Sequence, residues 1–223
     1  MSSEFVVDHP EAAAIVRGPR KTMCIKLFLK EVYWNELDFL IVDTPPGTSD
    51  EQMTIVECLG AANVDGAIIV TTPQQVSLID VKKEVNFCKT GGVKVLGVVE
   101  NMSGLSQPFS NLKFMKITDN SEMKDVTEWT LEYMREKAPE ILNFIASSEV
   151  FDSSGGGAIK MCNEMKVPFL GKVPLDPQLC KAAEEGRSCF KDKDCAVSAP
   201  ALQKIIDKMM ETIGLSMTVS NGV

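Results

Sequence analysis

Four runs of mostly apolar residues recur along the chain, and each is followed by a cluster of turn-forming residues. They are FLIVD at 39–43, GAIIVTT at 66–72, VKVLGVVEN at 93–101 and VPFLGKVP at 167–174. A continuous apolar run bounded by turn signals is typical of a central strand that is buried on both faces. We therefore expect these four runs to form neighbouring strands of one buried sheet.

Helical spacing of apolar residues appears between these runs and after the last one. Three sets keep the 3–4 spacing of a single helix face: Ile25, Phe28, Leu29 and Val32; then Leu78, Val81, Val85 and Cys88; and finally Leu202, Ile205, Ile206, Met209 and Ile213. Strands that alternate with helices favour right-handed βαβ crossovers and a parallel sheet. The sequence thus predicts an α/β fold, a parallel sheet with flanking helices, in a single domain over residues 1–223.

Residues 105–149 differ from the rest of the chain. The segment is rich in charge, as in KITDNSEMKDVTEW, and it has no strong strand pattern and no cysteine. We expect a mostly helical insertion at the ligand end of the sheet, serving as a lid or a dimer surface.

Composition narrows the class of protein. The chain has 223 residues, 44% hydrophobic, with no run near the roughly 18 to 20 apolar residues that a membrane span needs. Its formal charge of −8 argues against binding to nucleic acid or anionic lipid, and its one histidine argues against multi-histidine metal sites. Seven cysteines, an odd number, favour free thiols over a disulfide framework. We expect a cytoplasmic protein with neither membrane nor nucleic-acid partners.

Polar clusters follow all four predicted strands, and carboxyl ends of parallel strands meet at one edge of a sheet. Asp43 ends the first run, and a carboxylate there suits Mg²⁺. Gly47 allows close approach of its backbone to a phosphate, and Asn101 offers an amide that can contact an adenine edge. The alternative is that these aspartates and prolines only end strands, which is ordinary turn chemistry for Asp176 before Pro177.

Six motifs in order carry a family resemblance over about residues 10–190: RGPRK, YWNELDFLIVDTPPGTSDE, TTPQQVSLIDVKKEVNF, GVVENMSG, GGGAIKMC and VPFLGKVPLDP. Together they resemble the Mrp/ApbC-type P-loop ATPases, which act as iron–sulfur cluster scaffolds or carriers and are related to MinD and the nitrogenase iron protein. The chain is most similar to the cytosolic eukaryotic branch, in its plant-type form. The resemblance implies an ATP-dependent scaffold or carrier in cytosolic iron–sulfur protein assembly.

The resemblance also implies roles for individual residues and partners. Asp43 would be the catalytic aspartate near Mg²⁺ and Gly47 the sensor of the γ-phosphate. Asn101, Pro174 and Asp176 would lie near the nucleotide base. The implied cofactors are ATP, Mg²⁺ and a [4Fe–4S] cluster, and the implied partners are cytosolic apo iron–sulfur proteins and a second subunit, identical or related, in a dimer.

One departure from the family concerns the phosphate loop. The family's G-K-G-G-V-G-K-[ST] loop should lie upstream of RGPRK, but Gly-Lys-Ser and Gly-Lys-Thr occur nowhere in this chain. Such a loop supplies most of the phosphate-binding energy through backbone N–H groups and its lysine. We expect a fragment, a shortened isoform or an incomplete gene model that lacks the first strands of the P-loop fold, and little ATP binding or hydrolysis by this chain alone.

A second departure concerns the cluster ligands. Most relatives carry Cys-x-x-Cys shortly after ENMSG, where this chain has the residues LSQP at 105–108. Iron–sulfur clusters need thiolate ligands, and Cys162 and Cys180 flank the VPLDP edge as the best candidates. The alternative is that they are simply buried or exposed thiols. Cys24, Cys58 and Cys88 lie on apolar helix faces, where we expect a packing role.

Two other functions fit the same residues. The missing Cys-x-x-Cys favours a metal-free switch of the MinD or ParA type, in which nucleotide controls dimerisation. A third hypothesis is an inert fragment that pairs with complete subunits, because missing strands would leave sheet edges exposed.

Overall fold

The computed structural model describes residue 9 and residues 17–60, 64–151 and 155–215. The chain divides into two compact units, and each is described by itself. The first holds residues up to Ile69 together with Ile79–Leu96, and the second holds Val70–Leu78 and the residues from Gly97 onward. In the described ranges no helix is long and apolar enough to cross a membrane.

Two helices, α1 (Gly18–Lys30) and α2 (Asp50–Leu59), pack together in the first unit. A capping box between Ser49 and Gln52 begins α2. Lys21 Nζ lies 2.8 Å from Glu51 Oε1, and this hydrogen bond lowers the pKa of Glu51 to about 2. The predicted helix at Ile25–Val32 is confirmed, although it begins earlier in the chain and ends two residues before Val32.

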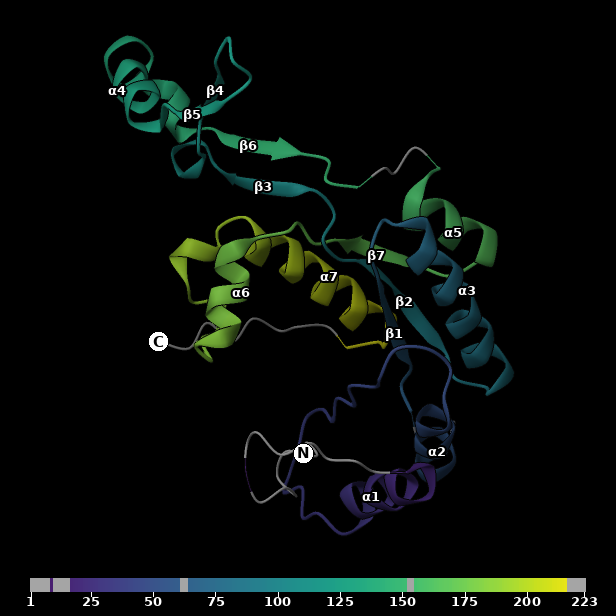
Figure 1. Ribbon diagram of the computed structural model, residues 1–223. Helices are drawn as coiled ribbons and strands as arrows, with labels where there is room; N and C mark the ends of the chain where they lie inside the picture. The colour runs from purple at the N-terminus through teal and green to yellow at the C-terminus, as the bar shows by residue number, and fades with distance from the viewer. Residues whose placement is uncertain (1–8, 10–16, 61–63, 152–154, 216–223) are drawn as a thin grey trace. The chain divides into compact units, whose positions relative to one another are not determined.

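Three of the four predicted strands are confirmed. They are β1 (Ala67–Thr71), β2 (Val95–Glu100) and β7 (Phe169–Lys172), and they lie in the order β1-β2-β7 in one sheet (Figure 1). The crossover from β1 to β2 is α3 (Gln75–Thr90), whose predicted apolar face is buried at Leu78, Val81, Val85 and Cys88. The chain therefore has the α/β architecture that its pattern predicts.

The predicted strand at residues 39–43 is wrong. This segment has no regular secondary structure, and its apolar side chains are exposed: Phe39 by 46%, Leu40 by 43%, Ile41 by 88% and Val42 by 37%. A buried parallel strand needs neighbours that complete its backbone hydrogen bonds. No strand among the described residues pairs with this run, so its apolar sequence alone does not make it a strand.

The core of the second unit forms around the pairing of β2 with β7. These strands are parallel, with Val98 opposite Phe169 and Glu100 opposite Lys172. The helices α5 (Gly157–Met165) and α7 (Ser198–Thr212) lie on opposite sides of β7 (Figure 1). The core cluster is Val99, Leu170, Val173 and Ile205, with Leu179 and Leu202 packed against it. The helix predicted from Leu202 to Ile213 is thus confirmed as a packing element.

Residues 105–149 are mixed in structure, not mostly helical. Strands β3 (Leu105–Pro108) and β6 (Ile145–Ser148) pair antiparallel, as do β4 (Met115–Ile117) and β5 (Met123–Asp125). The segment also contains α4 (Thr127–Lys137) and the 3₁₀ helices η3 (Phe109–Asn111) and η4 (Pro139–Asn143). All six residues of β4 and β5 are exposed, so they lack the alternating apolar pattern by which a strand is predicted.

Two further elements connect β7 to α7. Helix α6 (Pro177–Glu184) follows β7, and the 3₁₀ helix η5 (Lys193–Cys195) precedes α7. Ala182 of α6 and Cys195 of η5 are fully buried, so both elements belong to the core of the second unit.

Candidate functional site

The loops that follow β1, β2 and β7 meet through backbone hydrogen bonds in the second unit. Asn101 N–H donates to Thr71 O at 2.7 Å, which joins the loops after β2 and β1. Leu175 N–H donates to Gly104 O at 2.7 Å, which joins the loops after β7 and β2. Three of the four polar loops expected at the carboxyl edge of the sheet therefore lie side by side.

Two predicted base-binding residues engage in local hydrogen bonds. Asn101 Oδ1 accepts the N–H of Met102 at 2.9 Å, and Asp176 Oδ1 accepts the N–H of Gln178 at 2.9 Å as the N-cap of α6. This capping agrees with the turn chemistry considered for Asp176. Its other oxygen, Oδ2, is buried without a hydrogen-bond partner among the described residues. The half-buried Pro174 precedes this loop.

A buried carboxylate that sequence reasoning missed holds this edge together. Glu100, the last residue of β2, is only 1% exposed. Its Oε1 accepts the Ser103 hydroxyl at 2.7 Å and lies 3.2 Å from Lys172 Nζ, while its Oε2 accepts the Ala158 N–H at 2.9 Å. Glu100 thus links the loop after β2 to β7 and to the first turn of α5. The signal in the sequence was a charged residue at the end of the apolar run VLGVVE.

These hydrogen bonds determine the charge state of Glu100. Burial alone would raise the pKa of the carboxyl, but hydrogen bonds from Ser103, the Ala158 N–H and Lys172 outweigh it and hold the pKa below its usual range. A Cβ on Gly157 would lie 2.9 Å from Glu100 Oε2, and Gly157 has a φ of +54°. Gly157, the first residue of α5, therefore lets the helix N-terminus approach a charged carboxylate closely.

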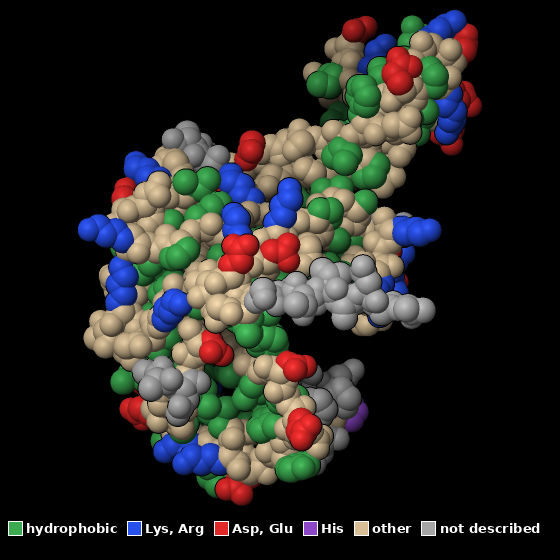
Figure 2. All heavy atoms as spheres, turned by 180° about the vertical axis from the view of Figure 1, so that it is seen from behind, with side chains coloured by type: hydrophobic (Ala, Val, Ile, Leu, Met, Phe, Trp, Pro, Cys, Tyr) green, Lys and Arg blue, Asp and Glu red, His purple; other side chains and the backbone are tan. Residues whose placement is uncertain are grey.

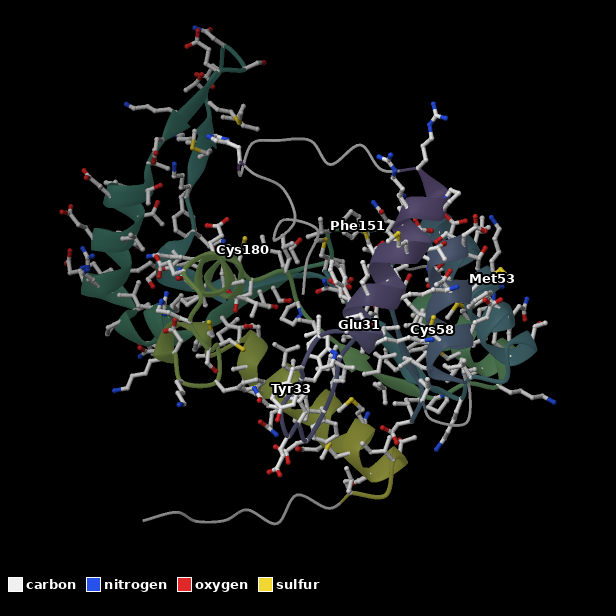
Figure 3. All side chains as sticks on the ribbon, turned by 90° about the horizontal axis from the view of Figure 1, so that it is seen from below. Glu31, Tyr33, Met53, Cys58, Phe151 and Cys180 are labelled. Atoms are coloured by element: carbon white, nitrogen blue, oxygen red, sulfur yellow. The ribbon has the colours of Figure 1, made fainter. Side chains whose placement is uncertain are left out.

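The two candidate cluster ligands lie in different surroundings. Cys162 of α5 is 1% exposed, and burial, with the Glu100 carboxylate nearby, raises the pKa of its thiol to about 11. Cys180 of α6 is exposed and labelled in Figure 3, with its Sγ 3.7 Å from Glu184 Oε1. At neutral pH Cys162 is a protonated core thiol, whereas Cys180 is accessible.

A complete cluster site is not formed by one copy. Among the residues that the structure describes, no three His, Cys, Asp or Glu side chains gather closely enough to hold a metal ion. A [4Fe–4S] cluster needs four thiolates or equivalent ligands. The described donor residues of a single copy therefore do not fit a resident cluster. Cys88 is buried on α3, as expected for a residue with a packing role.

Asp43 and Gly47 belong to the first unit. Asp43 is exposed, and the Gly47 N–H donates to Glu84 Oε1 at 2.9 Å. Gln52 supports this loop by donating from Nε2 to Pro45 O at 2.9 Å. The Gly47 amide, predicted to contact a phosphate oxygen, is thus aimed at an anionic oxygen of Glu84, a residue that the sequence pattern did not single out.

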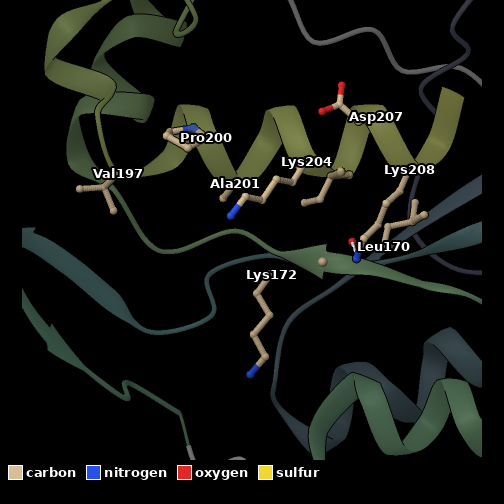
Figure 4. Close-up of a pocket in the computed structure, with 10 residues that line it drawn as sticks. Leu170, Lys172, Val197, Pro200, Ala201, Lys204, Asp207 and Lys208 are labelled. Atoms are coloured by element: carbon tan, nitrogen blue, oxygen red, sulfur yellow. Dashed lines mark hydrogen bonds between the residues drawn. The ribbon is translucent and has the colours of Figure 1, made fainter. Parts of the chain in front are cut away.

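A groove of about 570 Å³ runs between β7 and α7 in the second unit (Figure 4). Lys204 and Lys208 of α7 line it, and Lys208 Nζ donates to Leu170 O at 2.9 Å on β7. None of the predicted site residues lines this groove. It is separate from the polar loops that carry the candidate site.

Comparison with known families decides the classification. Residues 1–136 and 142–210 match the model of a ParA-type family described as the NUBPL iron-transfer P-loop NTPases. The chain belongs to this family. This agrees with the Mrp/ApbC resemblance carried by the sequence motifs.

Individual relatives support the same assignment. The chain is 41% identical over 209 residues to a protein of Aedes aegypti named as a cytosolic Fe-S cluster assembly factor Nubp2 homolog, covering 94% of this chain and 67% of that protein. A nucleotide-binding protein of Archaeoglobus fulgidus, solved with ADP and with cobalt, has a TM-score of 0.52 and 25% identity over 88% of this chain. The chain spans 60% of the length of that archaeal structure. The P-loop NTPase fold class expected from the sequence is therefore confirmed.

Proposed function

We propose that this chain takes part in the cytosolic assembly of iron–sulfur proteins, where it carries a [4Fe–4S] cluster as cargo to apo-proteins. The observation that carries the proposal is the match to the iron-transfer family over most of the chain, together with the 41% identical assembly-factor relative. The cluster is cargo in this proposal because the described residues of one copy do not gather into a resident cluster site. The cargo is then held jointly with a second subunit.

Cys180 is the residue of this chain best suited to contact the cargo. It is exposed on the first turns of α6, and its N–H donates to Asp176 O at 3.3 Å, next to the joined loops. An exposed thiol can lose its proton and reach an iron atom without unfolding any element. Cys162 can do so only if α5 leaves the core, so the proposal rests on Cys180.

Nucleotide control is the second part of the proposal. The residues for it are Asp43 for Mg²⁺, the Gly47 amide for the terminal phosphate, and Asn101, Pro174 and Asp176 for the base. The net negative charge of a bound nucleotide–Mg²⁺ complex would differ between ATP and its hydrolysis product. The Gly47 N–H must exchange Glu84 for phosphate when the nucleotide binds.

Cluster transfer tests this function. The chain, reconstituted anaerobically with iron and sulfide, is mixed with an apo-enzyme that regains activity only when a [4Fe–4S] cluster is inserted. We expect faster recovery of activity than with the same amounts of free iron and sulfide. Equal recovery in the two reactions would contradict the carrier function.

A metal-free switch is the second candidate, and one contact favours it. The Gly47–Glu84 hydrogen bond joins the 45–52 loop to α3, and such a contact has two alternative states if phosphate competes for the amide. In that case the chain retains no iron but still associates with a complete subunit of the family in a nucleotide-dependent way. An inert partner would associate regardless of nucleotide.

A further inference from the structure

The groove between β7 and α7 has an apolar end and a cationic end. Val197, Pro200 and Ala201 line the part near the start of α7, and Lys204 and Lys208 line the part farther along the helix. Figure 4 shows both lysine side chains extending from α7 toward β7. All the residues that line the groove belong to the second unit, so the groove lies within one compact unit.

The charge inside this groove is positive, although the chain has a net charge of −8. Lys204 is exposed. Asp207, the acidic residue among those that line the groove, points away from β7 in Figure 4, and its Oδ1 accepts Gln203 Nε2 at 2.8 Å. Lys172 extends from the opposite side of β7, where it pairs with Glu100. The two ammonium groups of α7 therefore favour an anionic ligand.

Strand β7 directs backbone groups toward the same groove. It lies at the end of the sheet β1-β2-β7 among the strands that the structure describes. Val173 N–H donates to Glu100 O on β2 at 2.9 Å, so the backbone groups of Lys172 point to the other edge. At that edge Lys208 Nζ donates to Leu170 O at 2.9 Å. A lysine is a common way to cover the edge of a sheet, and an added strand can displace it.

The spacing of residues on α7 matches the spacing in an extended chain. Ala201, Lys204 and Lys208 follow one another at three and four residues, which is about 4.5 and 6 Å along the helix. Alternate side chains of a strand lie on one face at intervals of about 6.6 Å. A strand along β7 can therefore place an apolar side chain beside Ala201 and one carboxylate beside each lysine. The sequence that fits reads apolar-x-acidic-x-acidic.

We propose that the groove between β7 and α7 binds an extended segment of a partner protein, which adds as a strand to the edge of β7 and carries acidic side chains at alternate positions. Backbone hydrogen bonds to β7 provide affinity, and Lys204 and Lys208 select the acidic side chains. Lys208 exchanges Leu170 O for a carboxylate when the strand binds. This binding goes beyond the carrier function, since it uses none of the candidate site residues and needs no cluster or nucleotide.

A labelled peptide tests the groove on the full chain, without iron or nucleotide. The probe is fluorescein-labelled Val-Thr-Val-Thr-Glu-Thr-Glu, and its matched peptide has glutamine in place of both glutamates. We expect saturable binding of the probe by fluorescence anisotropy in low salt. The glutamine peptide, and the probe in about 0.5 M salt, should bind at least roughly tenfold more weakly. Cluster transfer is a separate measurement, so either proposal can fail while the other stands.

Reversing the charge of the groove should have the same effect as removing the charge of the peptide. We expect Lys204→Glu with Lys208→Glu to weaken binding of the probe at least roughly tenfold. Lys204→Glu alone leaves the hydrogen bond from Lys208 to Leu170 in place, and it should weaken binding in the same direction even if the double variant does not fold.

The control is Lys116→Glu with Lys124→Glu, which changes the net charge by the same amount. These exposed lysines oppose each other across β4 and β5 and do not line the groove. The part of the molecule that carries them has basic, acidic and hydrophobic groups mixed on its surface (Figure 2). We expect this control to bind the probe as wild type does.

N-methylation distinguishes addition of a strand from attraction between charges alone. The N–H groups of successive residues in a strand point to opposite edges, so methylating alternate residues of the probe removes either the donors that face β7 or those that face away. We expect one of the two methylated peptides to bind at least roughly tenfold more weakly than the other.

Five results would overturn the proposal. They are no saturable binding by folded wild type, equal binding of the glutamate and glutamine peptides, unchanged binding by a folded groove variant, equal weakening in the control, and equal binding of the two methylated peptides. Binding that decreases as the concentration of the chain rises would show that a second copy fills the groove, and this too would contradict the proposal.

Discussion

The Glu100 carboxylate, nearly inaccessible to solvent, receives hydrogen bonds from a hydroxyl, a backbone amide and an ammonium group. Each donor belongs to a different segment: the loop after β2, the first turn of α5 and β7. Leaving any of these donors without its buried partner is costly. A single charged side chain therefore fixes the relative positions of the segments that surround Asn101 and Cys162.

Replacing this carboxylate by an amide should change stability in a pH-dependent way. The folded pKa of Glu100 lies below its ordinary value of 4.5, so its contribution is fully present above that pH and is lost as the pH falls through the folded pKa. We expect Glu100→Gln to lower the free energy of unfolding by about 1.5–3 kcal/mol at pH 7 and by much less near pH 3. Urea denaturation at the two pH values measures this.

Asp80→Asn is the control for Glu100→Gln. Asp80 pairs with Lys83 on the exposed face of α3, and such a surface pair contributes about 0–1 kcal/mol. A Glu100→Gln effect that is equally large at both pH values would show that Glu100 acts through its shape and not its charge.

At the scale of residues, the sequence predicts the position of the backbone better than the environment of a side chain. Backbone position can be predicted, because loops after parallel strands share an edge, and Asn101 and the 174–176 loop do lie together. The environment of a side chain cannot be predicted in the same way. Cys162 and Cys180 have equivalent sequence signals, yet Cys162 is in the core and Cys180 is exposed. Burial depends on which helix face meets the sheet, and a short helix such as α5 gives little periodic signal.

At the scale of elements, prediction succeeded where an apolar pattern also had a partner. The runs that became β1, β2 and β7 pair within the chain. The apolar stripe of α3 is buried, and that of α7 is buried at Ile205 and half-buried along the rest. Run 39–43 has an equally strong pattern but no pairing strand among the described residues. The short strands β3, β6, β4 and β5 do pair with one another. They lack the alternating apolar pattern of a strand because their side chains are mostly exposed. Pairing and pattern are separate requirements.

The packing of α7 on β7 gives a prediction at this scale. Ile205 is 7% exposed within the core cluster, and a Cβ added to Gly171 would lie 2.8 Å from its Cγ1. We expect Ile205→Ala to lower the free energy of unfolding by about 2–5 kcal/mol, because it leaves a cavity. Ile159→Ala on α5, where the side chain is 45% exposed, should lower it by less than about 1 kcal/mol. Equal losses in a denaturant titration would show that α7 is not a core element.

At the scale of the whole molecule, the sequence motifs gave the family and the fold class, and the family match and the α/β sheet agree with them. The arrangement of the site was harder to predict. Asp43 and Gly47 belong to one compact unit, and Asn101, Pro174, Asp176 and both candidate thiols belong to the other. A motif specifies local chemistry, whereas the arrangement of residues that are far apart in the sequence also depends on packing elsewhere in the chain.

The most direct test of the carrier proposal is the iron and acid-labile sulfide that the chain retains after anaerobic reconstitution and desalting. We expect wild type and Cys88→Ser to retain both in a cluster ratio with a visible charge-transfer spectrum. We expect Cys180→Ser to retain several-fold less iron, because Cys180 presents an exposed thiol beside the joined loops. Retention that is equal in Cys180→Ser and wild type would remove Cys180 as the cargo contact. No retained iron in folded wild type would contradict the carrier function and favour the metal-free switch.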